Sequence, residues 1–165
     1  MKISIPYLQE KLPVVVHEDR VMGVFYPNDV VRQQSLDAMI QSALNHPNGG
    51  ENFTQFLERE GKLIVIVNDG TRPTPTRAVL ESIGDRLIAR GATFIVATGI
   101  HREPTIEEYY FIFGPLYDKI KERVYSHDSR NDEMVFLGTS HNETPLYLNK
   151  RVVESENILV IGSVE

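Results

Sequence analysis

The sequence predicts an α/β protein with a Rossmann-like, mostly parallel sheet, helices on both faces and short N-terminal β-strands. Three short runs rich in β-branched residues are typical of strands buried on both faces: Lys62–Val67, Thr93–Ala97 and Ile158–Ile161. Helical patterns follow the first two runs, at Thr74–Arg90 and Thr105–Phe113. Alternation of strands and helices implies parallel strands joined by crossover helices.

Composition and charge narrow the class of protein. A chain of 165 residues, 41% hydrophobic and 24% charged, can form one domain with a substantial core. A net charge of −6 argues against a nucleic-acid partner, because phosphate backbones select basic surfaces. The sequence has no run approaching the roughly 18 apolar residues of a membrane span, and no signal-peptide core. It also has no cysteine, so we expect a soluble, cytoplasmic protein without disulfides or thiolate chemistry.

The N-terminal third is predicted to contain short strands and two helices. Met1–Ile5 and Leu12–Val16 are predicted to form a hairpin, with Val21–Phe25 as a third strand. Ser35–Leu44 is predicted to be a helix, because its first residue can cap it and apolar residues recur at helical spacing. Asn52–Glu60 is predicted to be a short second helix that ends at a glycine.

Helix start and stop signals bound the two longer helical patterns. Prolines lie at the start of Thr74–Arg90, and Gly91 follows its end. Thr105 and Glu108 have the spacing of a capping box at the start of the next helix, and a Gly-Pro pair stops that helix.

The C-terminal part is predicted to hold more strands. Short candidates at Val124–Ser126, Met134–Leu137 and Leu146–Asn149 precede the buried run Ile158–Ile161. The sequence ends a few residues after that run. We therefore expect residues 1–165 to be a single α/β domain, the N-terminal domain of a longer two-domain enzyme, cut after its last strand.

The first polar cluster, NDGTRPTPT, follows the first buried strand. Ligands of parallel sheets bind at the carboxyl ends of the strands, so this position is typical of a site. Arg72 offers a planar fork suited to a carboxylate or phosphate, and Thr71 offers a hydroxyl. Asp69 would weaken an anion site, so it fits better as a group that orients a histidine or binds a substrate hydroxyl. The simpler alternative is that Asp69 or Thr71 caps the helix and Arg72 is solvated.

A second polar cluster, ATGIHREPT, follows the next strand. Gly99 permits a sharp exit from the strand, after which His101 and Arg102 project at its carboxyl end. Histidine titrates near neutral pH, so His101, opposite Asp69 and Arg72, is a candidate general acid/base. The alternative is an incidental loop histidine.

Other candidates have less support. His127 and Asp128 could reach the same rim, but an exposed turn is the favoured interpretation, and His141 lies in a polar loop. A mononuclear metal site formed by His101, Asp69 and His127 is a further alternative, although the three lack a characteristic ligand spacing. The sequence has no dinucleotide-binding, P-loop, zinc-protease or α/β-hydrolase motif.

The pairing of NDGTRPTPT with ATGIHREPT resembles the nickel-dependent lactate racemase family of 2-hydroxyacid racemases and epimerases. The resemblance continues in VYSHDSRND, LGTSHNETPLYLNKRVVES and ILVIGSVE. It implies a two-domain enzyme whose active site lies between this domain and a C-terminal domain. At Ile100 and Glu103 members usually carry threonine and proline, so the resemblance does not identify lactate itself as the substrate.

The resemblance also implies a mechanism. The family's cofactor is a nickel-pincer nucleotide held covalently on a lysine, and its chemistry is hydride transfer from the α-carbon of a small 2-hydroxyacid. By motif match, His101 is one of two acid/base histidines, Asp69 supports it, and Arg72 with Thr71 binds the substrate. The second histidine, the cofactor lysine and the nickel-binding histidine are expected beyond Glu165, so we expect no metal ligand in this chain and no activity from it alone. The alternative function is a non-catalytic module that binds a carboxylate or phosphate.

Overall fold

The computed structural model describes residues 1–7, 10–26, 28 and 34–163. The chain divides into two compact units, Met1–Gln33 and Gln34–Glu165. Within the described ranges, no helix has the length and apolar character needed to cross a bilayer.

The first unit is an antiparallel hairpin of β1 (Lys2–Tyr7) and β2 (Glu10–Val15), which confirms the predicted pair. A 3-10 turn, Glu18–Arg20, follows it. The predicted third strand, Val21–Phe25, is wrong. An apolar run becomes a strand only when another edge supplies backbone partners, and none of the described residues pairs with this run.

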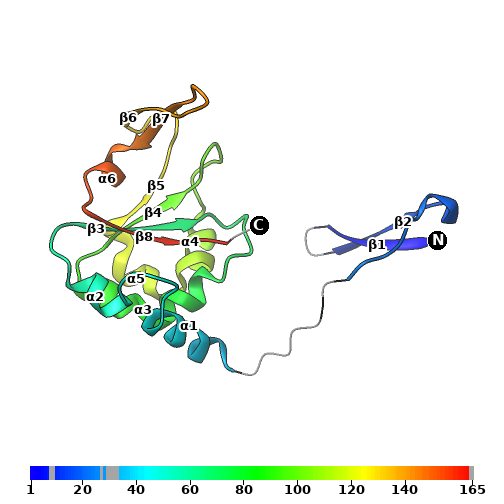
Figure 1. Cartoon of the computed structure of the whole chain (residues 1–165), viewed down its shortest axis with the longest axis horizontal. Coiled ribbons are helices and arrows are strands. Elements are labelled where there is room, and N and C mark those ends of the chain that lie inside the picture. Colours follow the sequence, from blue (N-terminus) through cyan, green and yellow to red (C-terminus); the bar gives the residue numbers. More distant parts are fainter. Residues whose placement is uncertain (8–9, 27, 29–33, 164–165) are drawn as a thin grey trace. The chain divides into compact units, whose positions relative to one another are not determined.

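The second unit is built on a four-stranded parallel sheet in the order β5–β4–β3–β8 (Figure 1). Its strands are β3 (Leu63–Asn68), β4 (Thr93–Ala97), β5 (Val124–Ser126) and β8 (Asn157–Ile161). Each lies within one residue of its predicted position, and the α/β fold class is confirmed. The remaining strands, β6 (Met134–Thr139) and β7 (Pro145–Asn149), form a separate antiparallel hairpin.

Helix boundaries follow the local capping chemistry. The side chain of Ser35 accepts the Ala38 amide at the start of α1, and Asn52 and Thr105 form capping boxes that begin α2 and α4. α3 begins two residues after the predicted Thr74. The helices of the unit are α1 (Leu36–Asn45), α2 (Phe53–Glu58), α3 (Thr76–Ala89), α4 (Ile106–Phe113), α5 (Tyr117–Ile120) and α6 (Lys150–Val153), with 3-10 turns at Gly114–Leu116 and Lys121–Arg123.

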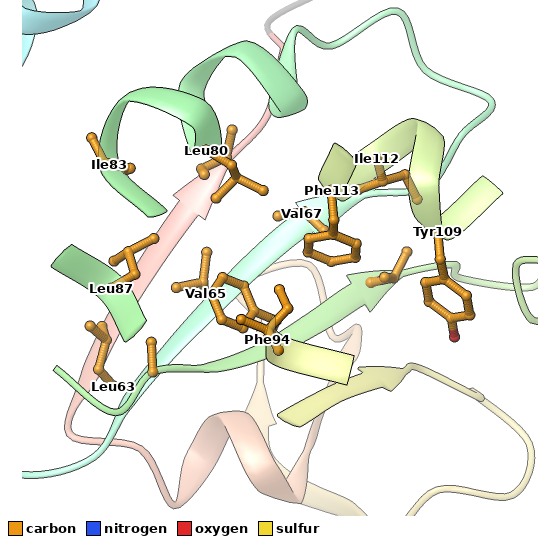
Figure 2. Packing of buried hydrophobic residues seen from close by; sticks show 14 of the residues in the cluster. Leu63, Val65, Val67, Leu80, Ile83, Leu87, Phe94, Tyr109, Ile112 and Phe113 are labelled. Carbon is orange, nitrogen blue, oxygen red and sulfur yellow. The ribbon is translucent and has the colours of Figure 1, made fainter. Parts of the chain in front are cut away.

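The helices lie on both faces of the sheet, but unequally (Figure 1). One face carries the main core, where strand residues such as Val65 and Phe94 pack against α2, α3, α4 and α5. Figure 2 shows Phe94 next to Phe113 of α4, and their rings meet edge to face at 5.8 Å. On the other face, Ile64 and Ile95 pack against Val152 of α6.

The path of the chain explains where ligands would be bound. From β3 the chain moves outward to β4 and β5 through α3, α4 and α5, and then returns to place β8 on the other side of β3. Crossover connections between parallel strands are right-handed. The connection that returns from β5 to β8 therefore crosses the face of the sheet opposite to the one crossed between β3 and β5. The carboxyl ends beside such a reversal form the ligand-binding crevice of this class of sheet.

A smaller side chain at a buried position of α3 tests the packing beneath the carboxyl ends of the strands. Ile83 is 2% exposed against the sheet, so Ile83→Val should lower the free energy of unfolding by about 0.5–1.5 kcal/mol, measured by urea denaturation. The same methylene removed from Ile106, which is 52% exposed at the start of α4, should change it much less. Equal losses at the two positions would contradict the core described above.

Candidate active site

The two polar clusters of the sequence meet at the carboxyl edge of the sheet. β3 and β4 are adjacent and parallel, with Asn68 in register with Ala97. Asp69 and Thr98, the next residues of each strand, are both buried there. The structure therefore brings together the segments NDGTRP and ATGIHRE.

Asp69 is held by the turn that follows β3. Its Oδ1 accepts the Thr71 hydroxyl at 2.6 Å and the Thr71 amide at 3.1 Å, and the side chain is 9% exposed. This is the hydrogen bonding of an Asx-turn, which fixes the carboxylate in one orientation. The helix-capping alternative for Asp69 and Thr71 is wrong, because the N-cap of α3 is Pro75.

His101 is positioned by a tight turn at the end of β4. Gly99 has φ of 62°, a left-handed conformation that glycine adopts without strain, and the His101 amide donates to the Thr98 carbonyl at 2.9 Å. The turn brings His101 Nδ1 to 2.6 Å from Asp69 Oδ2. An ionised carboxylate only accepts, so Nδ1 is the donor, and in the neutral ring Nε2 carries the free lone pair. The His101 side chain is 54% exposed, so this acid–histidine pair is open to a ligand.

The carboxylate of the pair is kept ionised. Burial raises the pKa of Asp69, but the hydrogen bonds from His101 and from the hydroxyl and amide of Thr71 outweigh it, and the pKa lies below its usual value. Asp69 therefore suits the support of a histidine that gains a proton during a reaction.

Arg102 is paired with Glu108 in the first turn of α4. Its guanidinium binds both carboxylate oxygens of Glu108 at 2.7 and 2.9 Å, and Glu108 also accepts the Thr105 amide at 2.7 Å. The bonds from Arg102 and Thr105 lower the pKa of Glu108 to about 2. The sequence indicated Glu108 only as a helix cap, so its pairing with Arg102 was not predicted.

The depressed pKa of Glu108 has a consequence for stability against pH. The folded state favours the ionised form of Glu108. Its contribution to the free energy of unfolding is therefore fully present above pH 4.5, the ordinary pKa, and is lost as the pH falls toward 2. Urea denaturation should show that Glu108→Gln is less stable than the parent above pH 4.5. The difference between their free energies of unfolding should shrink as the pH falls toward 2. Glu60→Gln, an exposed control, should show no such pattern. A gap for Glu108→Gln that is independent of pH would contradict this reading.

Arg72 lies beside the acid–histidine pair. Its amide donates to the Asp69 carbonyl at 3.4 Å, and Arg72 lines a pocket of about 300 Å³ together with Asp69 and Thr74. A second pocket, of about 230 Å³, contains Asp69, Thr71 and His101. Because Asp69 lines both pockets, the pocket that contains Arg72 adjoins the pocket that contains His101. The substrate-binding roles predicted for Arg72 and Thr71 remain predictions.

His127 is not the exposed-turn residue that was favoured from the sequence. It is 18% exposed, its Nδ1 lies 3.1 Å from Asn149 Nδ2, and that amide also donates to Asp132 at 2.6 Å. The hydroxyl of Thr98 donates to the His127 carbonyl, tying the end of β4 to the end of β5. Sequence reasoning missed Asn149 and Thr98, because both act through partners distant in the chain.

The metal-site hypothesis for His101, Asp69 and His127 is wrong. All three lie in the described ranges, and there no group of three histidine or acidic side chains is arranged to hold an ion. His101 and Asp69 instead bond directly to each other.

The sequence matches the lactate racemase N-terminal domain family over residues 7–165. The chain belongs to this family. It is 29% identical to a lactate racemase of Thermoanaerobacterium thermosaccharolyticum over 99% of its length, and 23% identical to a lactate racemase of Lactiplantibacillus plantarum over the same share. It also resembles the solved lactate racemase apoprotein of T. thermosaccharolyticum, with a TM-score of 0.72, 28% identity and 97% of this chain covered.

This racemase-family domain spans 40% of the length of both relatives and 38% of the solved chain. The resemblance inferred from the two strand-end motifs is confirmed. The prediction of a two-domain enzyme with a C-terminal partner domain remains a prediction, as do the catalytic roles of individual residues.

Proposed function

We propose that this domain supplies acid/base and substrate-binding groups to a 2-hydroxyacid racemase or epimerase. The observation that carries the proposal is the 2.6 Å hydrogen bond between His101 and Asp69, at the carboxyl edge of the sheet in a racemase-family domain. Inversion at a carbon that bears a hydroxyl, by way of the corresponding 2-oxoacid, requires a group that removes the hydroxyl proton and returns it. A histidine whose Nδ1 is held by a carboxylate and whose side chain is more than half exposed can do both through Nε2.

Each residue has a role that follows from its contacts. His101 Nε2 takes the proton of the substrate hydroxyl, and the Asp69 carboxylate stabilises the resulting imidazolium through Nδ1–H. Thr71 holds Asp69 in place by donating its hydroxyl, and its oxygen can still accept a hydrogen bond from the substrate. Arg72 binds the substrate carboxylate, for which its planar guanidinium is suited.

The family resemblance implies a nickel-pincer nucleotide, which when bound would accept hydride from the α-carbon and return it. The residues of this chain fit an arrangement in which this domain handles the proton and the C-terminal domain holds the cofactor. The described residues offer a proton-handling pair at an open pocket, and no cluster of metal ligands. His101 then takes the proton of the substrate hydroxyl at Nε2 and returns it from the same atom, while Asp69 holds the ring in place.

Isotope exchange tests this assignment in the holoenzyme. One enantiomer of lactate, or of a longer 2-hydroxyacid, is racemised in D₂O and the α-position is examined by NMR. Hydride transfer keeps the original α-hydrogen, because hydride does not mix with solvent, while the hydroxyl proton passes through His101 and exchanges. Deuterium at the α-carbon of the product would overturn the hydride mechanism, and failure to isomerise any 2-hydroxyacid would overturn the function.

A further inference from the structure

The turn that carries His101 lies beyond the paired part of the sheet. The pairing of β4 with β3 ends at Ala97, and its pairing with β5 ends at Val96. His101 follows these residues, where none of the described strand pairs fixes the backbone. Contacts made by the turn itself must therefore hold the His101 ring against Asp69.

Thr98 is the first residue of this turn, and both its backbone and its side chain are hydrogen-bonded. Its amide donates to the Val96 carbonyl at 3.0 Å, and its carbonyl accepts the His101 amide at 2.9 Å. Its hydroxyl reaches the neighbouring loop and donates to the His127 carbonyl. Thr98 is only 3% exposed, so water has little access to compete for this bond.

The carbonyl that accepts the Thr98 hydroxyl belongs to a residue that is itself well held. The His127 amide donates to the Val96 carbonyl at 3.0 Å. The His127 side chain is 18% exposed, and its Nδ1 lies 3.1 Å from Asn149 Nδ2 and 3.3 Å from Asp132 Oδ2. Because threonine is β-branched and has few rotamers, a bond to a fixed acceptor restricts it further. The Thr98 hydroxyl therefore anchors the start of the turn to the end of β5.

The other end of the turn is anchored at the surface. Arg102 binds Glu108 of α4 at 2.7 and 2.9 Å, but the Arg102 side chain is 66% exposed. Exposed ion pairs stabilise little, because water screens them. Removal of a buried hydroxyl costs more, since it leaves its carbonyl partner without a donor. Of these two anchors, Thr98 is the stronger.

We infer that Thr98 is a positioning residue for the reaction. Its hydroxyl, bonded to the His127 carbonyl, holds the turn in the place where His101 Nδ1 meets Asp69. Thr98 is buried and acts on the substrate only through His101, so the inference rests on the proposed function. Displacement of a reacting group by about 1 Å can lower a rate about 10²-fold, so one lost anchor is enough to affect turnover.

The kinetic test removes the hydroxyl and keeps the shape of the side chain. Thr98→Val should lower kcat of the holoenzyme about tenfold with a smaller change in KM, while Thr98→Ser, which keeps the hydroxyl, should stay within a factor of about three of the parent. Thr54→Val is the matched control and should leave kcat unchanged, because the Thr54 hydroxyl accepts its bond from Arg86 at 2.8 Å, between α2 and α3. Ile83→Val, which lowers stability in the core, should also keep kcat.

The proton on His101 Nδ1 reports the geometry independently of turnover. A proton in a short hydrogen bond to a carboxylate gives a strongly downfield NMR signal, and its loss in His101→Gln assigns it. Thr98→Val should move this signal upfield and speed its exchange with water, and Thr98→Ser should not. The double variant Thr98→Val/His101→Gln should be no slower than His101→Gln alone, within a factor of about three.

The outcomes separate the positioning role from the proposed function. An unchanged kcat in Thr98→Val, an equal loss in Thr98→Ser, or an unmoved proton signal would overturn the role of Thr98 while leaving the isomerase intact. Multiplication of the two losses in the double variant would also overturn it, since Thr98 would then act independently of His101. Absence of turnover by the parent with any 2-hydroxyacid would instead overturn the proposed function, and the proton signal would still test how Thr98 places His101.

Discussion

Replacing His101 with glutamine should lower kcat of the holoenzyme about 10²–10⁴-fold, the usual contribution of a positioned general acid/base. Glutamine is polar and of similar length, but its amide cannot take a proton from a substrate hydroxyl near neutral pH. The fold should survive, because the His101 side chain is more than half exposed and the turn is held by the backbone bond to Thr98. Steady-state kinetics with the preferred 2-hydroxyacid give the result directly.

A matched control distinguishes chemistry from a general effect of losing a histidine. His141 is exposed in the loop between β6 and β7, and His141→Gln should leave kcat unchanged. Full turnover by His101→Gln would contradict the catalytic assignment. It would favour the alternative of an anion-binding module, in which Arg72→Ala abolishes carboxylate binding and His101 is incidental.

The central βα units could be predicted because their signals are local. The buried strands are continuous apolar runs, and the capping boxes at Asn52 and Thr105 need only residues three apart. Placement of polar residues just after β3 and β4 then sufficed to predict that Asp69 and His101 approach each other. Parallel neighbours must present their carboxyl ends at one edge.

The remaining features depend on contacts between distant segments. Val21–Phe25 has the composition of a strand, but composition does not supply the edge that a strand must pair with. Asn149 reaches His127 and Asp132 across 22 and 17 residues, and α6, which it caps, has only four residues. Arg102 is drawn to Glu108 by a loop geometry that depends on the turn at Gly99. None of these leaves a periodic or spaced signal in the sequence.

The second large effect is expected at Asp69, which acts on the substrate through His101. Asp69→Asn should lower kcat about 10²–10⁴-fold with a smaller change in KM, because the amide can no longer stabilise an imidazolium and can turn its NH₂ toward Nδ1, favouring the wrong tautomer. Asparagine is nearly isosteric, and its amide oxygen can still accept the hydroxyl and amide of Thr71. Asp85→Asn, which alters an exposed carboxylate paired with Lys119, is the control and should leave kcat unchanged.

A double mutant separates a positioning role from an independent one. If Asp69 acts only through His101, then once His101 is glutamine the carboxylate has nothing left to orient or stabilise. The double variant Asp69→Asn/His101→Gln should therefore be no slower than His101→Gln alone, within a factor of about three. Multiplication of the two losses would show that Asp69 contributes separately, for example by contacting the substrate hydroxyl itself. Near-equality would place the 2.6 Å bond between Asp69 and His101 at the centre of the mechanism.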